Sequence, residues 1–297
     1  VLPILVTGGD YEQRISTGPT SMPIGFWLLR TSIRALGLVS PALAGSWVYR
    51  LWFQTLRFPE PQQEQEWRRT AEPLTILHRG QALAVDAWGA GPSILMVHGW
   101  NGRGAQLGAF APALVRAGYR VVSFDTPAHG RSPGRNTNLL EISEAIRTVA
   151  QGCGPVHAVI GHSFGVASAI HAVQQGLKVN RLVALSPPRS MRWITQSYFT
   201  AMGISTPVQA VFNRKFEAHF GADLWQRFSP EILARQLAVP GLVIHDENDR
   251  DVPWQEGAAL AHAWPGAQFV RTRGLGHRRI LRDPDVIARV TAFITTT

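Results

Sequence analysis

Residues 157–165 read His-Ala-Val-Ile-Gly-His-Ser-Phe-Gly, a short apolar run that leads directly into the pentapeptide Gly161-His162-Ser163-Phe164-Gly165. The run predicts a buried strand, and the pattern of residues 164–175 predicts a helix, so Ser163 falls on the turn between them. The motif G-x-S-x-G suits such a turn, because a strained strand-to-helix connection leaves no room for side chains on either side of the serine. Ser163 is therefore the candidate nucleophile.

The serine requires partners later in the chain. A hydroxyl is a weak nucleophile near neutral pH, so it needs a base, and the base needs a group that fixes its tautomer. His277 follows the last predicted strand and precedes the last predicted helix, and Asp249 lies in a loop after the preceding strand. Asp246 and Asp251 share that loop, and the spacing favours Asp249. The sequence thus predicts a triad of Ser163, His277 and Asp249.

The rest of the chain supplies a scaffold for such a triad. Short apolar runs alternate with helical patterns, which predicts an α/β fold with a mostly parallel central sheet and helices on both faces. Functional sites in such sheets form at the carboxyl ends of the strands. The predicted strands are residues 74–78, 82–88, 94–97, 120–124, 157–160, 182–185, 242–245 and 268–271, and the predicted helices are 105–117, 139–151, 164–175, 254–263 and 284–293.

One stretch interrupts the alternation, because the aromatic residues between Pro187 and Val239 recur at helical spacing. We interpret it as an inserted helical cap, a feature that supplies pocket walls. Residues 1–21 are expected to be irregular and residues 59–72 to form a polar connector. The predicted division is an N-terminal extension with amphipathic helices (1–72), the first part of an α/β core (73–188), a helical cap (189–239) and the second part of the core (240–297).

The N-terminal extension has an unusual charge pattern. Residues 23–58 predict two amphipathic helices broken near residues 40–41. No acidic residue lies between Glu12 and Glu60, whereas four arginines lie within residues 23–58. Two interpretations stay open: a helical pair over the mouth of a pocket, and peripheral contact with a membrane surface. The longest charge-free stretch there, residues 35–49, is shorter than the ~20 apolar residues that cross a bilayer.

Composition limits the remaining functional classes. The 297 residues are 45% hydrophobic and 16% charged, as expected of a packed globular protein. The net charge of +9 permits attraction to anionic partners, but no zinc finger, aromatic RNA-binding motif or long basic run predicts nucleic-acid binding. A single cysteine, Cys153, excludes an intramolecular disulfide and fits a reducing, cytoplasmic location. The histidines lack ligand-like spacing, so neither a metal nor another cofactor is expected.

From about residue 83 to its C-terminus, the chain resembles the α/β-hydrolase superfamily, in particular its serine esterase and lipase branch. The resemblance is carried by the pentapeptide around Ser163, by His98-Gly99-Trp100 after the strand 94–97, by the turn at residues 124–132, and by the acid loop at residues 249–253. These motifs stand in the family's order of serine, acid and histidine. The resemblance covers about 215 residues.

The resemblance implies roles for further residues. The backbone amides of Trp100 and Phe164 would form an oxyanion hole for the charge that develops when Ser163 attacks a carbonyl. We assign His98 and Trp193 to the substrate pocket, His98 as the residue that holds the oxyanion loop and Trp193 as part of the cap. Two positions depart from the family pattern, since Asp246 and Ala128 stand where related chains often have glycine.

The function implied is that of a serine hydrolase that cleaves a carboxylic ester or thioester through an acyl-enzyme on Ser163. The tryptophans and phenylalanines of the cap and the extension favour a small apolar substrate. An acyltransferase, a C–C hydrolase and a perhydrolase would use the same triad, and these alternatives stay open. So does a non-catalytic relic that binds a ligand or a membrane. The sequence makes no prediction of the oligomeric state.

Overall fold

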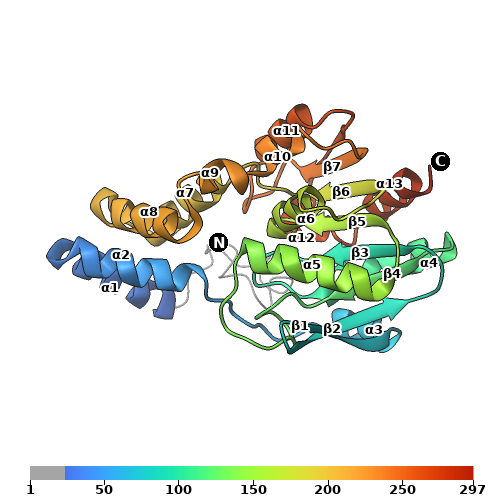
Figure 1. The fold of residues 1–297 in the computed structure, drawn as a ribbon, viewed down its shortest axis with the longest axis horizontal. Helices are drawn as coiled ribbons and strands as arrows, with labels where there is room; N and C mark the ends of the chain where they lie inside the picture. The colour runs from blue at the N-terminus through green and yellow to red at the C-terminus, as the bar shows by residue number, and fades with distance from the viewer. Residues whose placement is uncertain (1–23, 297) are drawn as a thin grey trace.

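An eight-stranded sheet forms the centre of the computed structural model, which describes residues 24–296 (Figure 1). The strand order is β1-β2-β4-β3-β5-β6-β7-β8; β1 and β2 run antiparallel to their neighbours, and the others are parallel. The strands are β1 (Glu72–His78), β2 (Gln81–Trp88), β3 (Ser93–Val97), β4 (Arg120–Phe124), β5 (Val156–His162), β6 (Arg181–Leu185), β7 (Gly241–Asp246) and β8 (Gln268–Thr272). The predicted α/β fold is confirmed, whereas the prediction for residues 1–21 concerns residues outside those described.

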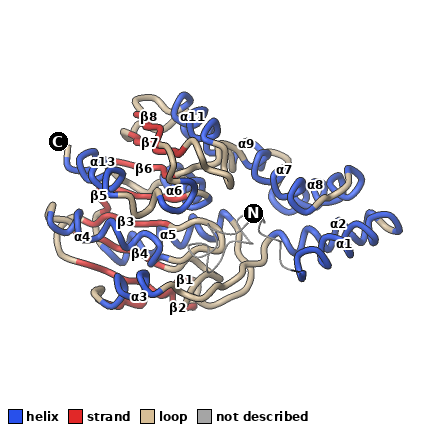
Figure 2. Tube along the Cα trace, turned by 180° about the vertical axis from the view of Figure 1, so that it is seen from behind, coloured by secondary structure: helices blue, strands red, loops and turns tan. Residues whose placement is uncertain are grey.

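Helices cover both faces of the sheet, as Figures 1 and 2 show from opposite sides. One face carries α5 (Leu139–Cys153), α6 (Phe164–Gln174) and α11 (Trp254–Ala263), and the other carries the 3₁₀ helix η2 (Gly104–Phe110), α4 (Ala111–Arg116) and α13 (Pro284–Thr295). Side chains of β3 alternate between the two faces: Leu95 and Val97 join one buried cluster, and Ile94 and Met96 join the other. This double burial explains why the central strands are continuous apolar runs.

A separate layer of helices lies to one side of the sheet, where α1 and α2 run beside α7 and α8 (Figures 1 and 2). Its longer helices are α1 (Ile24–Val39), α2 (Pro41–Trp52), α7 (Met191–Met202) and α8 (Thr206–Phe220), followed by the short α9 (Leu224–Arg227) and α10 (Pro230–Ala234). The rings of Trp52, Tyr198 and Phe212 meet edge to face inside this layer. The N-terminal helices and the segment predicted as a cap therefore share one aromatic core.

The break between α1 and α2 falls where the sequence predicted it. The Ser40 hydroxyl accepts a hydrogen bond from the Leu43 amide at 3.3 Å, and Pro41 occupies the first helical position, so α2 starts with a side-chain cap and a preset backbone angle. Among the described helices, none has the length and apolar character needed to span a bilayer.

The structure adds local detail to the sequence prediction in two places. The polar connector 59–72 contains a helix, α3 (Gln62–Arg69), which is held by a 2.7 Å ion pair between Glu64 and Arg103 and by Trp67 packed on Gly108. The helix expected over 105–117 begins as the 3₁₀ helix η2 and becomes α-helical only at α4. Tertiary contacts decide both cases, since neither stretch carries a strong apolar period of its own.

The contact between α2 and α8 depends on the absence of a side chain at Gly45, where a Cβ would lie 2.5 Å from Cβ of Val211. We expect Gly45→Ala to lower the free energy of unfolding by about 1–3 kcal/mol, because a rigid valine must move to admit the methyl group. Urea titrations followed by circular dichroism measure the change. Gly25→Ala in α1 is the matched control, because nothing lies within 4 Å of its added Cβ. Equal unfolding midpoints for the two variants would contradict tight packing of α2 on α8.

Candidate active site

Ser163 sits on a strained turn between β5 and α6. Its backbone angles are φ 53° and ψ −122°, in a region that residues with a side chain rarely adopt. A Cβ on Gly165 would lie 2.5 Å from the carbonyl oxygens of both Val97 and His98, and one on Gly161 would lie 2.9 Å from the backbone of α6. The two flanking glycines are thus required by the close approach of backbone, as the motif predicted.

The histidine and an aspartate of the predicted triad are in contact. His277, in the short helix α12 (Gly276–Arg279), lies with Nδ1 2.7 Å from Oδ2 of Asp249. The other oxygen of this carboxylate accepts hydrogen bonds from the amides of Asp251 and Val252, both at 2.9 Å. Burial raises the pKa of Asp249, but the charge of His277 and hydrogen bonds from His245, His277 and the Val252 amide outweigh it and hold the pKa well below its usual range. The buried carboxylate therefore stays ionised beside the imidazole.

Asp246, a competing candidate from the sequence, has a different place. Its carboxylate accepts hydrogen bonds from the amides of Asn248, Leu275 and Gly276 and from the Thr272 hydroxyl, at 2.8–3.0 Å. Burial raises the pKa of Asp246, and the backbone donors, Gly276 first, lower it by more. Asp246 thus ties the acid loop to the loop that carries the histidine, and Asp249 is the aspartate that touches His277.

A second histidine also reaches Asp249, which the sequence did not reveal. His245 is fully buried at the end of β7, and its Nε2 lies 2.8 Å from the Val252 carbonyl oxygen and 3.3 Å from Oδ2 of Asp249. Its Nδ1 faces Gly257, where an added Cβ would approach within 2.3 Å. Nothing in the spacing of His245 distinguished it from an ordinary core residue of an apolar strand.

His277 also lies beside the residue that precedes the serine. The rings of His162 and His277 are 4.6 Å apart, and Nε2 of His162 donates to the His277 carbonyl oxygen at 2.9 Å. Nε2 of His277 is buried and has no hydrogen-bond partner among residues 24–296. Since Nδ1 is bound to Asp249, this free nitrogen is the one that can exchange a proton with a serine, and such bonds often form only when substrate binds.

The residues expected at the oxyanion hole lie on both sides of Ser163. Gly99 passes so close that an added Cβ would lie 3.0 Å from Cβ of Ser163. The rings of Trp100 and Phe164 meet edge to face at 5.3 Å. The loop after β3 and the first turn of α6 are thus in direct contact around the serine, an arrangement that can present two amides to one oxygen.

The two residues assigned to the substrate pocket lie elsewhere. His98 is buried behind the loop, where its Nε2 accepts from the Thr126 amide at 3.0 Å and its Nδ1 donates to the Gly99 carbonyl oxygen at 2.7 Å. Burial lowers the pKa of His98, which keeps the ring neutral as this pattern requires. Trp193 is half-buried on α7 and packs against the core. Neither side chain lines the cavity beside Phe164.

That cavity includes Phe164, the residue after the serine, in its wall and is almost entirely apolar. Its walls come from three parts of the chain: the core, the helices α7 and α8 with the residue that follows α9, and the C-terminal end of α2. The lining residues are Trp52, Phe53, Trp100, Asn138, Leu139, Leu140, Phe164, Met191, Phe216, Phe220 and Phe228. The contribution of the N-terminal helices was left undecided by the sequence, because apolar periodicity shows which face of a helix is buried and not what covers it.

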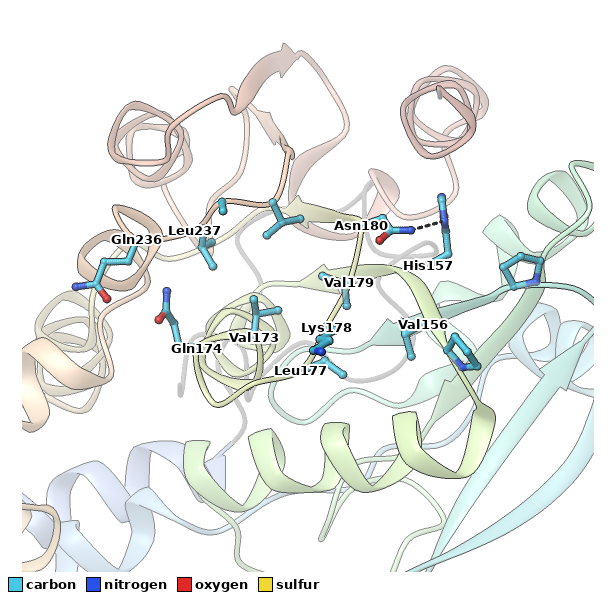
Figure 3. A pocket seen from close by; sticks show the side chains of 14 residues that line it. Val156, His157, Val173, Gln174, Leu177, Lys178, Val179, Asn180, Gln236 and Leu237 are labelled. Atoms are coloured by element: carbon cyan, nitrogen blue, oxygen red, sulfur yellow. Dashed lines mark hydrogen bonds between the residues drawn. The ribbon is translucent and has the colours of Figure 1, made fainter.

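A larger hollow of about 760 Å³ lies at the opposite, amino-terminal edge of the strands, where β5 begins and α6 ends (Figure 3). Three of its polar side chains have partners within the protein: Gln174 donates to the Leu233 carbonyl oxygen at 3.0 Å, and the Asn180 amide lies 3.3 Å from Nδ1 of His157. No triad member lines it, and residues 24–296 hold no acidic, cysteine and histidine cluster suited to a metal ion. The predicted triad thus lies away from this hollow, at the carboxyl edge of the sheet.

Comparison with known proteins agrees with this geometry. A family model described as the alpha/beta hydrolase family matches residues 94–290. The pimeloyl-(acyl-carrier protein) methyl ester esterases of Xanthomonas campestris pv. campestris (strain B100) and Stenotrophomonas maltophilia (strain K279a) are 26% and 29% identical to the chain. Each alignment covers 69% of this chain, with 95% and 93% of the relative. Among solved structures, an esterase from Exiguobacterium antarcticum superposes with a TM-score of 0.59 at 14% identity, over 76% of this chain and all of that one.

The two aspartates can be told apart by their amide variants. Asp249→Asn puts an N–H where His277 Nδ1 now donates, so we expect labelling of Ser163 by a fluorophosphonate to slow by about 10³–10⁴-fold with little change in melting temperature. Asp246→Asn places a donor against amide donors, so it should cost about 1–3 kcal/mol of stability. Labelling rates and thermal melts of both variants provide the measurement. Slow labelling in Asp246→Asn together with normal labelling in Asp249→Asn would reverse the assignment.

Proposed function

The chain belongs to the alpha/beta hydrolase family, and we propose that it is a serine hydrolase that cleaves a carboxylic ester or thioester through an acyl-enzyme on Ser163. The observation that carries the proposal is the buried Asp249–His277 pair, whose second imidazole nitrogen is unpartnered next to the strained turn at Ser163. The names of the relatives, which describe ester cleavage, support the same reaction class.

In this mechanism, the hydroxyl oxygen of Ser163 attacks the substrate carbonyl while Nε2 of His277 takes its proton. Asp249 holds the imidazole in the tautomer with Nδ1 protonated and stabilises the imidazolium. The amides of Trp100 and Phe164 donate to the oxyanion of the tetrahedral intermediate. His277 then gives the proton to the leaving alcohol or thiol, and the same residues activate water to hydrolyse the acyl-enzyme.

The acyl group is apolar in this proposal, because ten of the eleven residues around the cavity are aromatic or aliphatic. The exception, Asn138, uses its side-chain oxygen to cap α5 by accepting from the Glu141 amide at 3.0 Å. None of the described residues that line the cavity carries a charged side chain, so an acyl chain of medium length with an apolar end suits it. The relatives are named for a methyl ester of an acyl chain, which supports an acyl substrate of this kind.

The nucleophile is tested with a fluorophosphonate probe and with nitrophenyl esters and thioesters of graded acyl length. Wild type should be labelled and should turn over medium chains fastest, whereas Ser163→Ala should be unlabelled and should lose turnover by about 10⁴-fold or more. Product analysis in water with added alcohol separates hydrolysis from acyl transfer. Equal labelling of the two proteins would remove Ser163 from the mechanism.

We also propose that the helix pair α1–α2 contacts an anionic membrane surface. Ile24, Trp27, Leu28 and Leu38 recur at helical spacing on the side of α1 that faces away from the core, and each is at least half exposed. Exposed Arg34 lies on the same helix, with no acidic residue anywhere in α1 or α2. Apolar anchors beside cations and without anions suit the interface of an anionic bilayer.

Vesicle flotation tests this surface with a matched pair of variants. Wild type should float with phosphatidylglycerol vesicles and less with neutral phosphatidylcholine vesicles, and Leu28→Glu should reduce binding at least about tenfold, because it adds a negative charge to the contact face. Leu77→Glu in β1 is the control, since Leu77 is equally exposed but lies on the sheet. No flotation of wild type, or equal loss in both variants, would contradict the proposal.

A further inference from the structure

The N-terminal residues beside the cavity are joined to the core more firmly than an added extension requires. Phe53 caps the end of α2, and its carbonyl oxygen accepts from the Thr137 amide at 3.0 Å. The Thr55 amide donates to the Arg135 carbonyl oxygen, also at 3.0 Å, and Gln54 forms an antiparallel bridge with Asn136. The backbone of residues 53–55 is therefore fixed beside the chain that leads into α5.

The next residues reach the oxyanion loop itself. The Leu56 amide donates to the side-chain oxygen of Asn101 at 2.8 Å, and the Arg103 guanidinium donates to the Phe58 carbonyl oxygen at 2.7 Å. The guanidinium of Arg57 donates to three backbone carbonyl oxygens of the turn 130–134, at 2.7–2.9 Å. These hydrogen bonds fix the position of residues 53–58. A side chain must be held in a defined position if it is to select among substrates.

The rings around the cavity fall into two groups. Trp100 and Phe164 contact each other next to Ser163. Phe53 instead contacts Phe216 and Phe220, with centroids 6.4 and 6.0 Å apart. The N-terminal rings thus belong to the end of the cavity that is remote from the serine, where the tail of an acyl chain would lie.

We propose that Phe53, supported by Trp52, is the residue that sets the length of acyl chain accepted at Ser163. The proposal rests on the proposed function for the identity of the occupant. The centre of a water-sized sphere can move within only about 20 Å³ of the cavity, which is room for about one water, so a long acyl chain must displace a side chain from the wall. Trp52 and Phe216 are buried, but Phe53 and Phe220 are half-buried at the rim of the aromatic cluster. The ring of Phe53 therefore decides how far the tail can extend between the cap and α2.

Two substitutions of Phe53 should act in opposite directions. For nitrophenyl esters, Phe53→Ala should raise the ratio of kcat/KM for twelve-carbon over six-carbon chains at least about tenfold, the effect of burying roughly two further methylenes. Phe53→Trp should lower this ratio. Trp47→Ala is the control, because Trp47 is an aromatic residue of α2 that packs against the core and does not line the cavity. Unchanged ratios in both Phe53 variants would overturn the proposal.

A binding measurement separates this inference from the proposed reaction. Calorimetric titration of Ser163→Ala with fatty acids of six to fourteen carbons reports the cavity without the chemistry. Adding Phe53→Ala should move the tightest binding to longer acids. If wild type neither labels nor turns over esters but this shift occurs, the proposed function fails and the role of Phe53 stands. If Ser163→Ala binds none of the acids, or both proteins prefer the same length, the role of Phe53 is overturned.

Discussion

The site depends on one close approach of backbone, between the end of β3 and the turn at Ser163. The register of the sheet pairs Val97 with Gly161, which brings the loop after β3 against the first turn of α6. Gly165 lies directly under the carbonyl groups of this strand end, where no other residue fits. A slip of the pairing by one residue would turn the side chains to the opposite face and move the loop away from the serine. Strand pairing, rather than the serine motif alone, places Ser163 and the loop after β3 together.

A second pairing does the same for the other half of the site. β7 and β8 are in register with Asp246 opposite Thr272, so the acid loop and the histidine loop leave the sheet side by side. The Asp246 carboxylate then binds the backbone of both loops, which frees Asp249 to face His277. Two buried carboxylates in one loop are stable because each accepts several hydrogen bonds. Asp246 binds backbone amides, and Asp249 binds the imidazole of His277. Sequence spacing does not show which group an aspartate contacts, so it separated the two only weakly.

The sequence predicted what short-range patterns encode. All eight strands were found because they are short apolar runs bounded by turn residues, and Ser163 and His277 were predicted as site residues because their positions after strands are local features. Their mutual contacts are not local, so His245 escaped notice and His98 was assigned to a pocket that it does not line. Helix α3 was missed because its stability comes from Arg103 and Gly108, about 40 residues later. Ala128 has φ 66°, so the departure from glycine there is tolerated at the cost of a strained backbone.

The N-terminal segment shows why a chain should be divided by its contacts. The family model begins at residue 94, yet the chain from Phe53 to Phe58 binds the oxyanion loop and the turn before α5. Removing it would leave the amide-binding oxygen of Asn101 without its partner and would open the aromatic cavity to water. The exposed face of α1 looks away from this site, while the end of α2 forms its wall. One helix pair can therefore meet a membrane on one side and shape the acyl site on the other, and the two interpretations left open by the sequence are compatible.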